Sequence, residues 1–142
     1  MDDSEQVSST HRLRIFLASP GDVVDERALA LRVVEQLEYD PLLRGRITLE
    51  AVAWDKPGGG TPMLATMTPQ EAIDRGLPKP SQCDIVVVII WSRMGTPLPD
   101  SYTKPDGGRY ASGTEWEFED AVRAATESGR PRVLVYRRSE KV

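Results

Sequence analysis

The sequence is poor in the residues on which several common kinds of site depend. In 142 residues it has one cysteine, Cys83, and one histidine, His11. A single cysteine excludes an intrachain disulfide framework and fits a reducing compartment, so we expect a cytoplasmic protein. A single histidine close to the N-terminus excludes catalytic triads built on histidine and argues against most zinc sites. We therefore expect neither a metal centre nor a bound cofactor.

Long apolar runs and a strong net charge are also missing. No stretch approaches the roughly 20 apolar residues that a membrane-spanning helix needs. Residues 1–11 are polar and acidic, so we expect a disordered leader without the apolar segment of a signal peptide. The net charge of −4 provides no general attraction to nucleic acids or anionic membranes, and we expect neither as a partner.

The rest of the chain has the pattern of one small α/β domain, which we place at residues 12–138. Short apolar runs predict strands at 14–18, 47–54, 85–90 and 133–136. Capping residues predict helices after Asp22, Thr68 and the segment 112–114. The first and last helices should bury apolar stripes made of Val24, Ala28, Leu31, Val34 and Leu37, and of Phe118, Ala121, Val122 and Ala125.

The order of these elements predicts a three-layer fold. Alternating strands and helices favour a parallel sheet with right-handed crossovers and helices on both faces. Ile85–Ile90 is apolar throughout, which is typical of a central strand. We expect a flavodoxin-like sheet with the strand order 2-1-3-4. Four strands are few for such a sheet, so we expect a domain of a longer protein, with residues 139–142 as a tail or the start of a linker.

Doubly wound sheets bind ligands beyond the carboxyl ends of the strands, where the strand order reverses. Here that point lies between the first and third strands. The residues that we expect to line a ligand pocket follow these strands or begin the last helix: Ser19, Gly21, Asp22, Trp91, Ser92, Arg93, Ser112 and Thr114.

Two carboxylates, Glu115 and Glu117, lie in the first turns of the last helix, near the same edge. The chain has neither a Rossmann fingerprint nor a phosphate-binding loop, so carboxylate chemistry is the remaining catalytic option. A lone glutamate can act as a nucleophile or stabilise an oxocarbenium ion when the leaving group departs readily. Nicotinamide leaving NAD is such a case, because the ring is already cationic in the substrate.

Each of these residues also has a structural interpretation. Glu117 could complete a capping box with Thr114, and Glu115 could do the same with Ser112. Arg93 could pair with Asp22 or Glu115 instead of a ligand. Ser19 and Asp22 suit a turn and a helix cap, Trp91 suits the core, and Cys83 suits a buried thiol. Gly58–Gly60 is either a gating loop or a flexible connection.

The sequence resembles a TIR-like domain of unknown function that is found at the N-terminus of STAND-type NTPases (NACHT or NB-ARC proteins) and of TPR and WD-repeat proteins. The resemblance spans residues 12–138. Five segments carry it: Ile15–Arg27 (IFLASPGDVVDER), Ala72–Leu77 (AIDRGL), Cys83–Val88 (CDIVVV), Trp91–Pro97 (WSRMGTP) and Gly113–Phe118 (GTEWEF).

The resemblance implies a signalling or effector domain of an NLR-like protein. Catalytic TIR domains, more distant relatives, need a glutamate early in the helix after the third strand, and Glu117 matches that position. Nucleoside deoxyribosyltransferases carry a Gly-Thr-x-x-Glu-x-x-x-Ala pattern, which Gly113, Thr114, Glu117 and Ala121 also match. Three functions follow as expectations: NAD hydrolysis on oligomerisation, non-catalytic signalling by self-association, and nucleoside or nucleotide glycosyl transfer. C-terminal NTPase or repeat domains are the expected covalent partners.

Overall fold

A computed structural model of the protein describes residues 10–19, 23–54, 68–90, 104 and 113–139. The expected alternation of strands and helices is confirmed. In chain order the elements are β1 (His11–Ala18), α2 (Val24–Leu37), β2 (Ile47–Val52), α3 (Pro69–Asp74), the 3-10 helix η1 (Pro80–Gln82), β3 (Ile85–Ile90), α4 (Gly113–Ser128) and β4 (Arg132–Arg137). β1 begins earlier than the sequence pattern predicts, and η1 is too short to leave a periodic signal.

The four strands form one parallel sheet in the order β2-β1-β3-β4. β1 is paired on both sides, since Ile15 lies opposite Ala51 of β2 and opposite Ile85 of β3. β3 is the second interior strand, and β2 and β4 form the two edges of the described sheet. The expected flavodoxin-like α/β fold class and its 2-1-3-4 order are therefore confirmed.

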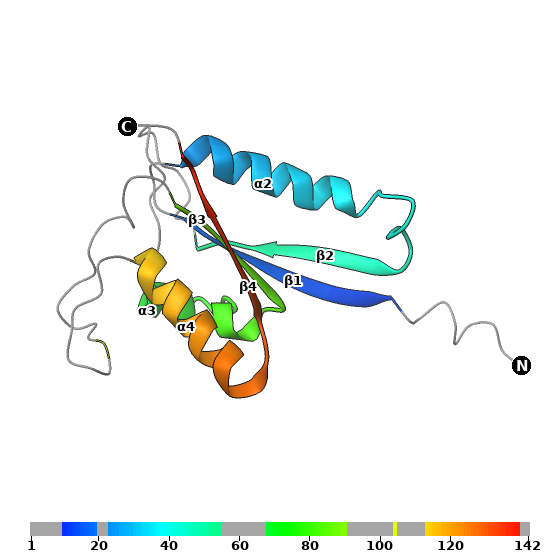
Figure 1. Ribbon diagram of the computed structural model, residues 1–142. Helices are drawn as coiled ribbons and strands as arrows, with labels where there is room; N and C mark the ends of the chain where they lie inside the picture. Colours follow the sequence, from blue (N-terminus) through cyan, green and yellow to red (C-terminus); the bar gives the residue numbers. More distant parts are fainter. Residues whose placement is uncertain (1–9, 20–22, 55–67, 91–103, 105–112, 140–142) are drawn as a thin grey trace, which may run out of the picture.

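Helices cover both faces of the sheet, which gives three layers. Figure 1 shows α2 on one side and α3 and α4 on the other. Side chains of β1 alternate between the two faces: Phe16 and Ala18 belong to the apolar cluster beneath α3 and α4, and Ile15 and Leu17 to the cluster beneath α2. The fully apolar run of β3 is explained by its burial between these layers.

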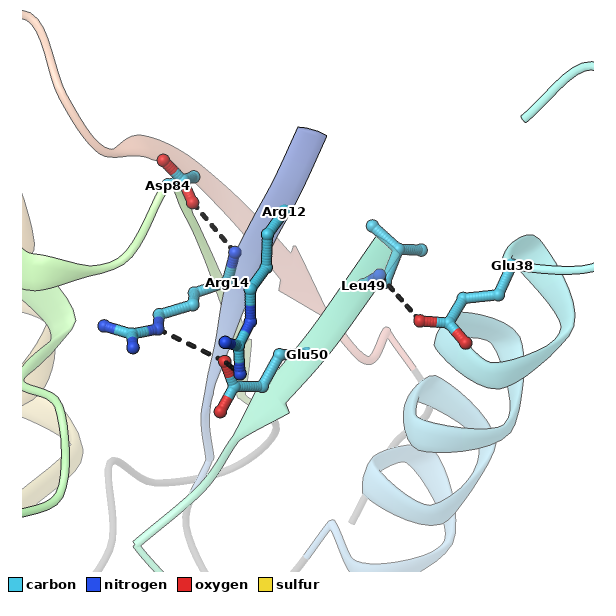
Figure 2. A network of polar contacts seen from close by, with 6 residues as sticks. All are labelled: Arg12, Arg14, Glu38, Leu49, Glu50 and Asp84. Carbon is cyan, nitrogen blue, oxygen red and sulfur yellow. Dashed lines mark hydrogen bonds and ion pairs between the residues drawn. The ribbon is translucent and has the colours of Figure 1, made fainter. Parts of the chain in front are cut away.

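Charged side chains connect β1 to its two neighbours in the sheet, β2 and β3 (Figure 2). Glu50 Oε2 accepts hydrogen bonds from Arg12 Nη2 at 2.7 Å and from Arg14 Nε at 3.2 Å, linking β1 to β2. Asp84, directly before β3, accepts the backbone N–H of Arg14 at 2.8 Å. Glu38, just after α2, accepts a backbone N–H of β2 at 2.6 Å and so satisfies a donor on an edge strand.

Two helix boundaries follow local capping rules, whereas the expected cap of α2, Asp22, is not the observed one: Val23 holds the capping position and makes no side-chain cap hydrogen bond. The Thr68 hydroxyl accepts the backbone N–H of Glu71 at 3.3 Å, and Pro69 is the first helical residue of α3, both as expected. Gly129 follows α4 with φ of +81°, a left-handed conformation that glycine adopts without steric cost. These local signals place the helix ends independently of the rest of the fold.

Candidate active site

The carboxyl ends of the strands and the first turns of α2 and α4 lie at the same edge of the sheet (Figure 1). This follows from the topology, because each helix runs antiparallel to the strands that it connects. Ser19 lies directly after β1, and Thr114, Glu115 and Glu117 lie in the first turns of α4. The structure thus brings the four described site candidates to the edge at which doubly wound sheets bind ligands.

Glu117 lies on the buried face of α4. Its exposed fraction is 6%, and Thr114, Asp120 and Ala121 are buried on the same side of the helix. The expected apolar stripe through Phe118 and Val122 is partly wrong, since Val122 is 37% exposed. The helix is turned so that a row of polar residues faces inward. Carboxylates are rarely so deeply buried, which distinguishes Glu117 from an ordinary surface residue.

Asp120 explains the orientation of α4. Its Oδ2 accepts the backbone N–H of Ser81 in η1 at 3.0 Å, and α4 packs directly against η1. The charge-assisted hydrogen bond holds the polar side of the helix against the polar 3-10 turn. Because η1 left no signal in the sequence pattern, the contact that orients Glu117 could not be predicted from the sequence.

The bounds of α4 do not place Thr114 at the capping position that a capping box with Glu117 requires. α4 begins at Gly113, so Thr114 is its second residue, whereas a capping box needs the threonine at the position before the first helical residue. The alternative cap, Ser112, lies outside the described residues. Glu117 therefore belongs to the second turn of α4 and is not a capping residue.

Glu115 is held by an ion pair. Its carboxylate contacts the Lys104 ammonium, which also lies 3.3 Å from Glu119. The hydrogen bond to Glu115 raises the pKa of Lys104 above its usual value. The Glu115 side chain is 15% exposed and that of Glu119 is 36% exposed, so Glu115 is the more shielded of the two. This pair gives Glu115 a structural role.

A buried arginine accompanies Ser19. Arg27 of α2 is buried, and its Nη1 donates a hydrogen bond to the Ser19 hydroxyl, which is buried as well. Arginine stays charged in proteins, so a buried guanidinium needs hydrogen-bond acceptors around it. Residue-based reasoning missed Arg27 because Ala28 was expected in the apolar stripe, and Ala28 is exposed. The only sequence signal for the burial of Arg27 was its helical spacing from two apolar residues, Val23 just before α2 and Val34 within it.

Three aromatic rings fix the first turns of α4 against the core. Trp116 lies 5.7 Å from Trp54, and Phe16 of β1 meets Trp54 edge-on at 5.2 Å between ring centroids. Trp54 Nε1 donates to the backbone carbonyl of Pro78 at 3.0 Å, so the buried indole is satisfied. Since Trp116 precedes Glu117 directly, this packing fixes the backbone that carries the carboxylate.

Six expected pocket residues lie outside the described residues: Gly21, Asp22, Trp91, Ser92, Arg93 and Ser112. The glycine loop at 58–60 lies outside them too. Cys83 is buried as expected, and burial raises the pKa of its thiol to about 12, so it is not a thiolate nucleophile near neutral pH. Within the described ranges no three His, Cys, Asp or Glu side chains are grouped to hold a metal ion.

Comparison of the sequence with known protein families and proteins does not assign the chain to a family. No protein-family model matches the chain, and no curated protein sequence does either. In the part of the chain that the structure describes, no helix has both the length and the apolar character needed to cross a membrane. The functional argument therefore rests on the fold and on the residues at its carboxyl edge.

Proposed function

We propose that this protein is a TIR-like effector domain of an NLR-like (STAND) protein, and that it hydrolyses the nicotinamide N-glycosidic bond of NAD when it oligomerises. The observation that carries the proposal is the position of Glu117. It is a buried carboxylate in the second turn of α4, at the carboxyl edge of a parallel sheet of order 2-1-3-4. Doubly wound folds bind nucleotides at this edge.

The proposed chemistry needs only one carboxylate. The bond between the ribose anomeric carbon and the nicotinamide nitrogen breaks, and its electron pair neutralises the positive charge of the ring. Nicotinamide then leaves without protonation. Glu117 stabilises the cationic ribosyl centre or adds to it, and water supplies the new oxygen and releases one proton. A carboxylate in a site shielded from water stabilises such a cation better than one in bulk solvent.

The burial of Glu117 connects the chemistry to assembly. At 6% exposure in the single chain, its carboxylate offers little surface to a dinucleotide. We attribute access to a rearrangement that accompanies oligomerisation, so that turnover depends on protein concentration. Ser19, directly after β1, and Arg27, in the first turn of α2, are polar groups at the same edge, and the hydrogen bond between them positions the guanidinium there.

The test is nicotinamide release from NAD over a wide range of protein concentration, with Glu117→Gln and Glu115→Gln as a matched pair. The wild-type rate per molecule should rise with concentration. Glu117→Gln should lose at least about 100-fold, the size of effect usual for a catalytic carboxylate, while keeping its fold. Glu115→Gln removes the charge that pairs with Lys104 and should stay within a few fold. Full turnover by Glu117→Gln would refute the proposal.

A non-catalytic module that signals by self-association is the second candidate. The observation that favours an interaction module over an enzyme is the exposed apolar surface of α2 and β4, which includes Leu29 and Tyr136. Assembly that depends on concentration, with no nicotinamide release at any concentration, would establish this function instead. Exchange of nucleobases without cleavage of NAD would indicate glycosyl transfer.

A further inference from the structure

An apolar groove runs along the sheet face that carries α2, away from Glu117. Its volume is about 480 Å³. α2 forms one wall, β4 forms the other, and β1 and β3 form the floor. The wall residues that matter here are Leu29, Val33 and Leu37 of α2, and Leu134 and Tyr136 of β4.

The groove exists because one helix cannot cover this face of the sheet. α2 packs over β1 and β2, and no other described helix lies on its side (Figure 1). Parallel sheets normally bury both faces, and the part of this face over β3 and β4 is apolar although no described helix covers it. Leu134 is 42% exposed and Tyr136 is 57% exposed, values that are unusual for side chains on a parallel sheet.

The dimensions of the groove fit one helix. α2 has 14 residues, which corresponds to about 21 Å, and β4 has 6 residues, which corresponds to about 20 Å. Leu29, Val33 and Leu37 recur at intervals of four and form a ridge along the wall. A helix of three to four turns could pack against this ridge, beside α2 and over β3 and β4, at the usual separation of 8–10 Å.

The charged residues beside the groove indicate which kind of helix could bind there. Residues 130–138 contain four arginines and no carboxylate: Arg130, Arg132, Arg137 and Arg138. Side chains two residues apart on a strand share a face, so Arg132 and Arg138 lie on the same side as Leu134 and Tyr136, which line the groove. Arg132 begins β4, and Arg138 directly follows it. At the carboxyl end, Arg138 Nη1 meets Glu26 of α2 at 2.8 Å and joins the two walls. Because Glu26 already pairs with Arg138, the positive charge on the groove side of β4 is that of Arg132, which is exposed at the amino end of the strand.

We propose that this groove binds an amphipathic helix of a partner protein, with aliphatic residues facing the sheet and acidic residues along the flank over β4. The proposal is independent of the catalytic one, because it concerns the opposite face of the sheet. A small molecule fits less well, since the groove offers only an already paired Glu26 and Arg138 to orient it. A second copy fits less well because the outer side of α2 carries exposed Asp25, Arg32 and Glu35.

The test uses the full chain and a fluorescein-labelled synthetic helix of about 15 residues, with leucine at i, i+3, i+4 and i+7 spacing and glutamate on one flank. Fluorescence anisotropy should show saturable binding at a ratio of one to one. Leu134→Asp and Val33→Asp, from opposite walls, should each weaken binding about tenfold or more, because a charge replaces a buried aliphatic contact. Leu42→Asp is the matched control, since Leu42 is exposed outside the groove, and it should leave binding unchanged.

Charge supplies the second arm. Arg132→Glu should weaken binding several fold, and a peptide with lysine in place of glutamate should bind more weakly than the original. The proposal is overturned if both groove variants bind like wild type, or if the lysine peptide binds equally well. It is also overturned if the peptide does not bind and the chain sediments as a dimer that Leu134→Asp dissociates, which would make a second copy the occupant.

Discussion

Arg27 and Glu117 are the two charged side chains buried most deeply among the described residues, and they lie in the first turn of α2 and the second turn of α4, toward the carboxyl edge of the sheet. Burial of a charge is costly unless hydrogen bonds and opposite charges compensate for it. A fold retains such residues where they position a structural element or act on a ligand. The burial of Glu117 fits the catalytic proposal, and that of Arg27 fits a role in holding the end of β1 through Ser19.

Cys83 illustrates how burial changes the chemistry of one side chain. Its thiol pKa is about 12 in the folded protein, against 9.0 as its ordinary value, because burial disfavours the thiolate. The pKa is raised on folding, so the stabilising contribution is complete below about pH 9 and is lost as pH rises toward 12.

Urea unfolding of the wild type and of Cys83→Ala should show this dependence. The stability advantage of the wild type should be constant between about pH 6 and 8 and should shrink at about pH 10.5, because the unfolded chain then ionises the thiol. An advantage that is equal at both pH values would show that the thiol titrates alike in both states.

At the scale of elements, the carboxylates of Glu50 and Asp84 connect neighbouring strands through different kinds of partner (Figure 2). Glu50 forms two ion pairs between side chains on the surface of β1 and β2. Asp84 accepts a backbone N–H of β1 and thereby connects β3 to the central strand. Exposed ion pairs contribute little because water screens them, whereas loss of the half-buried Asp84 acceptor leaves a backbone donor of an interior strand without its partner.

Asp84→Ala should therefore lower the free energy of unfolding by about 1–3 kcal/mol, and Glu50→Ala by less than about 1 kcal/mol. Chemical denaturation of the two variants beside the wild type provides the measurement. Equal losses would mean that the surface pairs of Glu50 hold β1 and β2 together as strongly as Asp84 holds β1 and β3.

At the scale of the whole molecule, the strands of the sheet are not equally buried. β1 and β3 are interior strands, with strongly buried residues such as Phe16 and Val86. β4 is an edge strand, and its Leu134, Val135 and Tyr136 are exposed. Stability within a domain follows such local differences in burial, so β4 should open more readily than the centre of the sheet.

Native-state hydrogen exchange should show this gradient. Amides of β1 and β3 should exchange slowest, and those of β4 should exchange faster by at least about tenfold. The acidic amphipathic peptide should slow exchange in β4 and α2 and leave β2 unchanged. Equal protection of the amides in all four strands would contradict the prediction that β4 opens more readily than β1 and β3.

Local signals in the sequence were sufficient for the order of the elements, the helix ends at Thr68 and Gly129, and the central position of Ile85–Ile90. These features depend on capping, on backbone conformation and on apolar runs, all of which are properties of neighbouring residues. The strand order 2-1-3-4 was expected because the alternating pattern was interpreted as flavodoxin-like, since right-handed connections alone allow other orders.

Only the tertiary structure decided which sides of the helices are buried. α4 turns toward Glu117 because Asp120 bonds η1, and α2 turns toward Arg27 because that guanidinium meets Ser19. The partners in each pair are distant in the sequence or belong to different elements, so no local period reveals them. The uncovered groove between α2 and β4 has the same origin, since the coverage of a sheet depends on how many helices pack on each face, and not on the pattern within any one of them.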